Sequence, residues 1–244
     1  MQEKTKDTLI LFTPAIIVDI IFFIIIPFLF IPSELWRKNP AKAVEDFLVL
    51  MYTTGMVLWP IIQIIFGLYA HKTLRKIGYS AEEIFGFSKF KERILGYMII
   101  IVILIGITEL LFFLEALINM IIFSMTYEEY WKQFARVLVR IPYWLRLFTW
   151  LVAPFTASIC EELFYRAYGI NMLEKHGVSE KKAVLIQAVA FGLWHGISVH
   201  TLITGIIGLI FGFIYVSDKR KTLMPLIIAH WIIDFLGFMI YVFV

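Results

Sequence analysis

The stretch from Thr8 to Ile31, TLILFTPAIIVDIIFFIIIPFLFI, contains a single ionisable residue, Asp19. A helix needs roughly 20 predominantly apolar residues to cross the hydrocarbon core of a bilayer, and this stretch is long enough. It is too long for a removable signal peptide and carries no small-residue cleavage site. The stretch is therefore predicted to be a retained membrane-spanning helix.

The remainder of the chain has the same character. Of its 244 residues, 61% are hydrophobic, whereas soluble domains are roughly 45–50% apolar. Apolar runs predict spans near residues 8–31, 46–70, 94–124, 143–170, 183–199, 201–216 and 222–243. The expected fold is an all-α, polytopic membrane helix bundle of about seven (seven to eight) transmembrane helices. It forms one integral-membrane domain over residues 1–244.

The net charge is only +3, and the basic residues lie between the apolar runs rather than in one patch. A nucleic-acid partner is therefore not expected, and the basic residues instead indicate topology. The loop from His71 to Arg93 is the richest in Lys and Arg, and Lys219 and Arg220 precede the last span. The positive-inside rule places these loops and the N-terminus in the cytoplasm, with the cell (plasma) membrane as the expected location.

Residues 130–141 have a different pattern. Basic side chains recur every four residues, at Lys132, Arg136 and Arg140, and the opposite face is apolar. This spacing predicts an amphipathic helix that lies in the membrane interface. A connector lying on the membrane is favoured over an element that guides substrate.

Ionisable side chains inside the predicted spans are candidates for function, because each costs several kcal/mol unless it is paired or hydrated. Asp19, Glu109 and Glu115 are isolated, and we expect them to bond a neighbouring helix or to lie near the interface. His200 falls at a span end and is expected to be solvated or interfacial. The remaining candidates are concentrated in the last four spans: Glu161, Glu162, Arg166, His195, His230 and Asp234.

Helical spacing groups these candidates. Glu162 and Arg166 are four residues apart, so they share a helix face and are expected to form an ion pair. Glu161 lies about 100° away around the same helix and is free to point elsewhere.

The histidines follow the same rule. Phe191 lies one turn before His195, and His230 and Asp234 are one turn apart. Counted from the cytoplasmic ends of their predicted spans, Glu161, His195 and His230 lie at similar depths, roughly 12 to 18 Å at 1.5 Å per residue. Three helices are therefore expected to converge on one site.

This set of residues suits two chemistries. A buried carboxylate oriented by a histidine could take a proton from water, while the second histidine stabilises an oxyanion. Alternatively, His195, His230 and a carboxylate, Glu161 or Asp234, could bind Zn²⁺ with one position left for water. Two further interpretations are a buried polar network without chemistry and a thiol nucleophile at Cys160.

The motifs resemble those of the CAAX-protease and bacteriocin-processing (CPBP, Abi-type) family, which includes the type II CAAX prenyl endopeptidases. EExxxR appears as EELFYR (Glu161 to Arg166), FxxxH as FGLWH (Phe191 to His195), and Hxxx(N/D) as HWIID (His230 to Asp234). Each motif alone is weak, but the three in order are specific. The resemblance covers a catalytic core of about residues 143–243, and the first three spans match only as apolar helices.

The resemblance implies a membrane endopeptidase whose cavity opens toward the cytoplasmic leaflet. Carried over by position, Glu161 is the general base, His195 its partner and His230 the oxyanion donor. Glu162 and Arg166 become the supporting ion pair.

Asp234 stands where many prenyl-protein proteases carry Asn. An ionised Asp can only accept hydrogen bonds. Asp234 could be protonated and donate, could orient His230, or could ligate a metal. A glutamate-dependent reaction that requires no cofactor is preferred, with Zn²⁺ as the alternative.

The expected substrate is a membrane-embedded or lipidated peptide or protein, and the short chain suits a prokaryotic member of the family. Two non-enzymatic alternatives are a membrane scaffold or immunity protein and a proton-coupled transporter with relaying Glu and His side chains. The transporter lacks support, because the sequence has no obvious inverted repeat.

Overall fold

The computed structural model describes residues 2–218 and 221–243, with side chains described from Thr5 onward. Lys219 and Arg220, which entered the topology prediction, lie outside the described residues. Within the described part, the chain is 87% helical and contains no strand. The prediction of an all-α bundle is therefore confirmed.

The elements follow one another with short connections. The first half of the chain contains α1 (Gln2–Asp19), η1 (Ile20–Ile25), α2 (Ile26–Phe30), α3 (Ser33–Lys38), α4 (Pro40–Lys76), α5 (Ala81–Phe85), α6 (Phe87–Glu92) and α7 (Ile94–Ile122). The second half contains α8 (Tyr127–Leu138), α9 (Tyr143–Glu161), η2 (Glu162–Ile170), α10 (Asn171–Lys175), α11 (Glu180–Leu193), α12 (Val199–Ser217) and α13 (Met224–Phe243). The η elements are π-helical and continue the α-helices that precede them.

Six helical segments of the described chain are long and apolar enough to cross a membrane: Thr5–Phe30, Pro40–Lys76, Ile94–Ile122, Tyr143–Lys175, Val199–Ser217 and Met224–Phe243. The chain is therefore an integral membrane protein. The predicted span at residues 183–199 is the one that is missing from these six segments. Its helix, α11, has 14 residues, which at 1.5 Å per residue is about 21 Å and shorter than a bilayer core of about 30 Å.

The chain turns after α11 because Gly196 adopts a positive φ of 89°, which glycine reaches without a steric penalty. As a result, α11 and α12 form a hairpin and pack closely against each other. The sequence predicted a span that continues to residue 199, whereas the helix ends at Leu193, before this turn.

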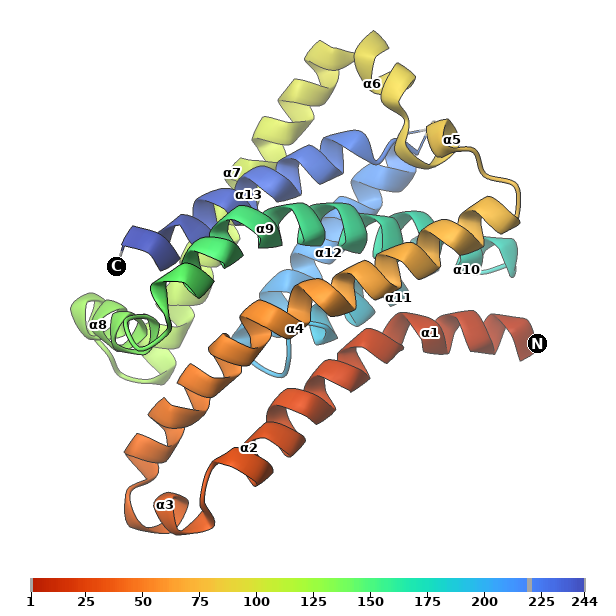
Figure 1. Cartoon of the computed structure of the whole chain (residues 1–244). Coiled ribbons are helices and arrows are strands. Elements are labelled where there is room, and N and C mark those ends of the chain that lie inside the picture. The colour runs from red at the N-terminus through yellow and green to blue at the C-terminus, as the bar shows by residue number, and fades with distance from the viewer. Residues whose placement is uncertain (1, 219–220, 244) are drawn as a thin grey trace.

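In Figure 1, α4, α9 and α13 run alongside one another as long helices. α9 packs between α4 and α13, and α13 also packs against α7. α1 lies along the outer edge and contacts α11 and η2. The motif-bearing elements therefore pack against helices of the first half of the chain: α9 and η2 against α4, α11 against α1, and α13 against α7.

Small residues bring these helices close together. A Cβ added to Gly67 on α4 would lie 2.8 Å from Cβ of Cys160 on α9, and one added to Gly192 on α11 would lie 2.6 Å from the carbonyl oxygen of Thr201. Membrane helices commonly use small residues in this way, because lipid supplies no hydrophobic drive for association. These contacts set the distances between the backbones that carry the site.

The π-helix η2 begins directly after Glu161, and all nine of its residues are buried. π-helical turns are rare and occur frequently at functional sites. Because they widen the turn, side chains beyond Glu161 rotate away from the positions an ideal α-helix would give them.

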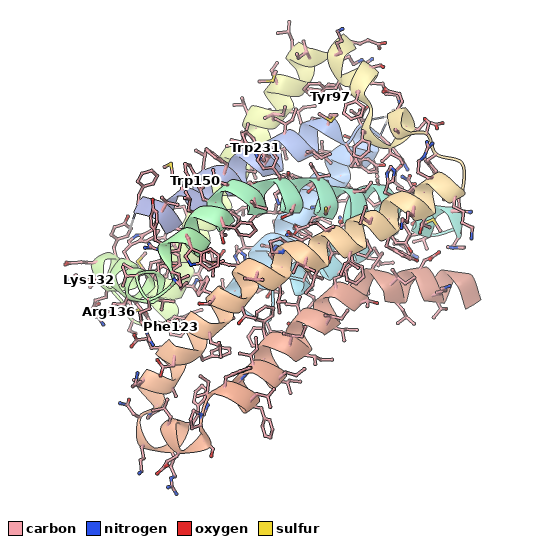
Figure 2. The ribbon with its side chains drawn as sticks, viewed as in Figure 1. Tyr97, Phe123, Lys132, Arg136, Trp150 and Trp231 are labelled. Carbon is pink, nitrogen blue, oxygen red and sulfur yellow. The ribbon has the colours of Figure 1, made fainter. Side chains whose placement is uncertain are left out.

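α8 is the amphipathic segment. It begins at Tyr127 because Thr126 and Glu129 form a capping box, with mutual hydrogen bonds between each side chain and the other residue's backbone N–H. These hydrogen bonds hold the pKa of the Glu129 carboxyl below its ordinary value. Lys132 and Arg136 point outward from this end of the bundle (Figure 2). Placement of α8 at the membrane interface stays a prediction.

Candidate active site

Glu161 is the last residue of α9 and is only 4% exposed. Its Oε1 accepts a hydrogen bond of 2.7 Å from Nε2 of Gln63 and one of 2.8 Å from Nε1 of Trp194. Gln63 comes from α4, and Trp194 caps the C-terminus of α11. The carboxylate is therefore held from two sides, and its other oxygen, Oε2, is left for a different partner.

That other partner is the imidazole of His230. Its Nε2 lies 3.9 Å from Oε2 of Glu161 and 3.5 Å from Oδ2 of Asp234, while its Nδ1 lies 2.8 Å from Oε1 of Glu162. An ionised carboxylate can only accept, so Nδ1 carries the proton in the bond to Glu162. The structure thus brings Glu161, Glu162, His230 and Asp234 together around one ring.

Arg166 is the cation of this cluster. Nη1 of Arg166 lies 3.2 Å from Oε1 of Glu162, and both side chains are 0% exposed. The guanidinium also lies over the ring of Phe191, 4.2 Å from its centre, and 5.4 Å from that of Phe211. An aromatic face attracts a desolvated cation. Phe191 and Phe211 therefore help to accommodate a charge that would be costly to bury alone.

His195 lies in the turn just beyond α11. Its Nδ1 is 2.8 Å from the carbonyl oxygen of Phe191, and a carbonyl only accepts, so Nδ1 carries a proton and Nε2 is left free. The expected proximity of Phe191 and His195 is present, with ring centres 4.9 Å apart. Among the described residues, however, no hydrogen bond joins His195 to Glu161; the neighbouring Trp194 makes that bond instead.

Residues 142–236 match the family model of the type II CAAX prenyl endopeptidases, Rce1-like. This match covers less than half of the chain, and it shows that residues 142–236 are similar to the Rce1-like family. The resemblance predicted from the three motifs is therefore confirmed, and all three lie inside the matched region. Comparisons with curated proteins and with solved structures gave no match.

The matched region begins at α9 and ends within α13, so the match does not include α1 to α8. α4 nevertheless supplies Gln63 to the cluster. In the sequence, Gln63 stands out only as an amide within an apolar run. A search restricted to ionisable side chains does not find it. The sequence also gives no signal for Trp194. It occupies a variable position of the motif FxxxH, and a tryptophan is expected among apolar residues.

A second pair lies beside His195. Nδ1 of His200 is 2.9 Å from Oε2 of Glu115 on α7, and the His200 ring stacks on Phe112. Its ring centre is 5.5 Å from that of His195. The expectation that Glu115 bonds a neighbouring helix is confirmed. The His200 side chain is 39% exposed, and its placement at the membrane interface stays a prediction.

The residues suggested for a zinc site do not assemble as ligands. In the part of the chain that the structure describes, no group of three His, Cys, Asp or Glu side chains is placed to hold a metal ion. The structure thus gives no ligand set from which a metal-dependent step can be derived.

A small cavity adjoins Glu161 on the side facing α1 and α4. It has about 10 Å³ that the centre of a water molecule can occupy, and it is lined by Pro14, Gln63, Phe66, Cys160, Glu161, Phe164, Tyr165 and Trp194. A space of about this size is sufficient for one water.

Proposed function

We propose that this chain is an intramembrane endopeptidase that hydrolyses a peptide bond in a membrane-embedded or lipidated, CAAX-like peptide or protein. The match to the Rce1-like family and the membrane-length helices support the class of enzyme. The observation that carries the proposal is the environment of Glu161: a buried carboxylate with one oxygen anchored and the other facing His230.

Glu161 is the general base. Because Oε1 already accepts hydrogen bonds from Gln63 and Trp194, Oε2 is the oxygen with capacity to take a proton from water. A positioned base of this kind contributes roughly 10²- to 10⁴-fold to a rate.

His230 is the oxyanion donor. Its Nδ1–H is committed to Glu162, so a proton on Nε2 is the one available to the developing negative charge on the scissile carbonyl. Asp234 orients the ring from the Nε2 side rather than donating itself. Arg166 pairs with Glu162 and balances its charge, while Glu162 accepts the hydrogen bond that holds His230.

His195 acts as the partner of Glu161 through water rather than by direct contact. Its Nδ1–H bond to Phe191 fixes the tautomer, so Nε2 can accept the remaining O–H of the water as the water oxygen moves onto the scissile carbonyl carbon. The site belongs to the cytoplasmic half of a plasma membrane protein whose N-terminus is cytoplasmic, as the distribution of basic residues indicates.

The test is cleavage of a library of lipidated and unlipidated peptides by protein reconstituted in liposomes. Glu161→Gln keeps the shape of the side chain and removes the base, so turnover should fall by at least about 10²-fold. Glu109→Gln is the matched control, because Glu109 is an exposed carboxylate on a membrane-length helix outside the site, and it should leave turnover unchanged.

Wild-type turnover in a folded Glu161→Gln protein would overturn the assignment of the base. Absence of cleavage by the wild-type protein across the library, with correct folding shown by thermal unfolding, would instead favour a non-catalytic scaffold. Among the described residues, no contact specifically favours the transporter.

A further inference from the structure

The mechanism above leaves the hydroxyl of Tyr165 unused. Tyr165 is 2% exposed, and its Oη has no hydrogen-bonding partner among the described residues. Burying an unpaired hydroxyl costs about 1–3 kcal/mol, and the hydrocarbon core of a bilayer supplies no water to pair with it. A phenylalanine at this position would fill the same space without that cost. The hydroxyl of Tyr165 is therefore expected to bind a ligand.

Gln63 has the same feature. Its amide nitrogen donates to Glu161, but its Oε1 is buried and has no partner in the part of the chain that the structure describes. Gln63 and Tyr165 come from different elements, α4 and η2, and both line the small cavity beside Glu161. Two unpaired polar side chains and a carboxylate thus border one space.

The cavity matches a single water in size and in bonding. Its volume of about 10 Å³ for water centres suits one molecule. A water has two hydrogens to donate and two lone pairs. It can donate to Oε1 of Gln63 and to the carboxylate of Glu161 while it accepts from the hydroxyl of Tyr165. All three side chains are then satisfied, and apolar Pro14, Phe66 and Phe164 close the rest of the lining.

We propose that Tyr165 and Gln63 are positioning residues that bind one water in this cavity and present it to Glu161. This inference rests on the proposed function, in which the same water is the nucleophile. Glu161 removes one proton, the water oxygen bonds to the scissile carbonyl carbon, and the C–N bond breaks as the proton passes to the leaving nitrogen. Tyr165 and Gln63 hold the oxygen in place and exchange no proton with the substrate.

The variant Tyr165→Phe isolates this role, since it removes one oxygen and keeps the ring contacts with Phe164 and Phe191, whose centres lie 5.0 and 5.2 Å away. The expected result is a fall in kcat of at least about 10-fold, the order expected for one lost hydrogen bond to the reacting group. KM should stay within about twofold, because the hydroxyl contacts water rather than peptide.

Tyr215→Phe is the matched control. Tyr215 is equally buried, but its hydroxyl accepts a hydrogen bond of 3.0 Å from Asn171 and it does not line the cavity. This variant should keep wild-type kcat. Wild-type kcat in Tyr165→Phe, or an equal loss in both variants, would overturn the inference.

A second measurement separates this inference from the proposed function. An experimental structure that shows ordered water should contain one within hydrogen-bonding distance of Tyr165 Oη and Gln63 Oε1, and it should be lost in Tyr165→Phe. If the wild type cleaves peptides but this water is missing, the inference alone fails. If the water is present and the wild type cleaves nothing, the water site stands while the proposed function and the catalytic role of the water fail.

Discussion

The indole Nε1 of Trp194 lies 2.8 Å from Oε1 of Glu161. This bond joins the motif FxxxH to the motif EExxxR through a position that neither motif specifies. It connects the end of α11 to the end of α9, and together with Gln63 it leaves only one oxygen of Glu161 unanchored.

Trp194→Phe should therefore reduce turnover while the protein still folds. A hydrogen bond to a charged group contributes roughly 1.5–3 kcal/mol, which corresponds to a fall in kcat of about 10- to 100-fold if the bond is needed in the transition state. The loss should be measured as kcat on the best peptide of the library.

Trp150→Phe is the control for that substitution. Trp150 lies on α9 nearer to α8 (Figure 2), and its Nε1 donates to the carbonyl oxygen of Phe235 at 3.0 Å. The variant Trp150→Phe also loses an indole N–H donor, but at a position away from the site, so its kcat should stay within about twofold of wild type. Equal effects of both changes would mean that Trp194 acts only through stability.

Arg166→Met should destabilise the protein. Arg166 and Glu162 form an ion pair with no exposure, and removing one partner of a buried pair costs about 3–5 kcal/mol because the other charge is left unpaired. The double variant Glu162→Gln with Arg166→Met removes both charges and should recover part of that loss. Unfolding in detergent checks both values, and a double variant less stable than Arg166→Met would contradict the pairing.

Cys160→Ala should stay active. Cys160 lines the cavity next to Glu161, so a thiol nucleophile is the nearest chemical competitor to the glutamate. Turnover within about threefold of wild type would exclude the thiol, because loss of a covalent nucleophile reduces rates by orders of magnitude. Loss of turnover in a normally folded Cys160→Ala protein would favour it.

Chelation should leave the enzyme unaffected. The described side chains form no three-ligand group for a metal, so peptide cleavage after prolonged treatment with a strong chelator should equal that of untreated protein. Cleavage that disappears on chelation and returns with added Zn²⁺ would establish a metalloenzyme. The metal content of the purified protein should be measured alongside.

Local features of the chain were predictable from sequence. Runs such as Thr8 to Ile31 dictate membrane helices, because a bilayer tolerates only backbone whose hydrogen bonds are satisfied within the segment. The ion pair between Glu162 and Arg166 follows from a spacing of four, since one helical turn brings such side chains together.

The partners of Glu161 depended on tertiary packing. Gln63 is 98 residues away in the chain and Trp194 is 33 residues away, and only the packing of α4 against α9 and of α11 against η2 brings them to the carboxylate. The end of α11 was likewise not predicted, because the predicted span continues to residue 199 whereas the helix ends at Leu193, before the turn at Gly196. Composition and periodicity report on neighbours within a helix, whereas the hydrogen bonds that orient Glu161 are made between helices whose relative positions no local pattern encodes.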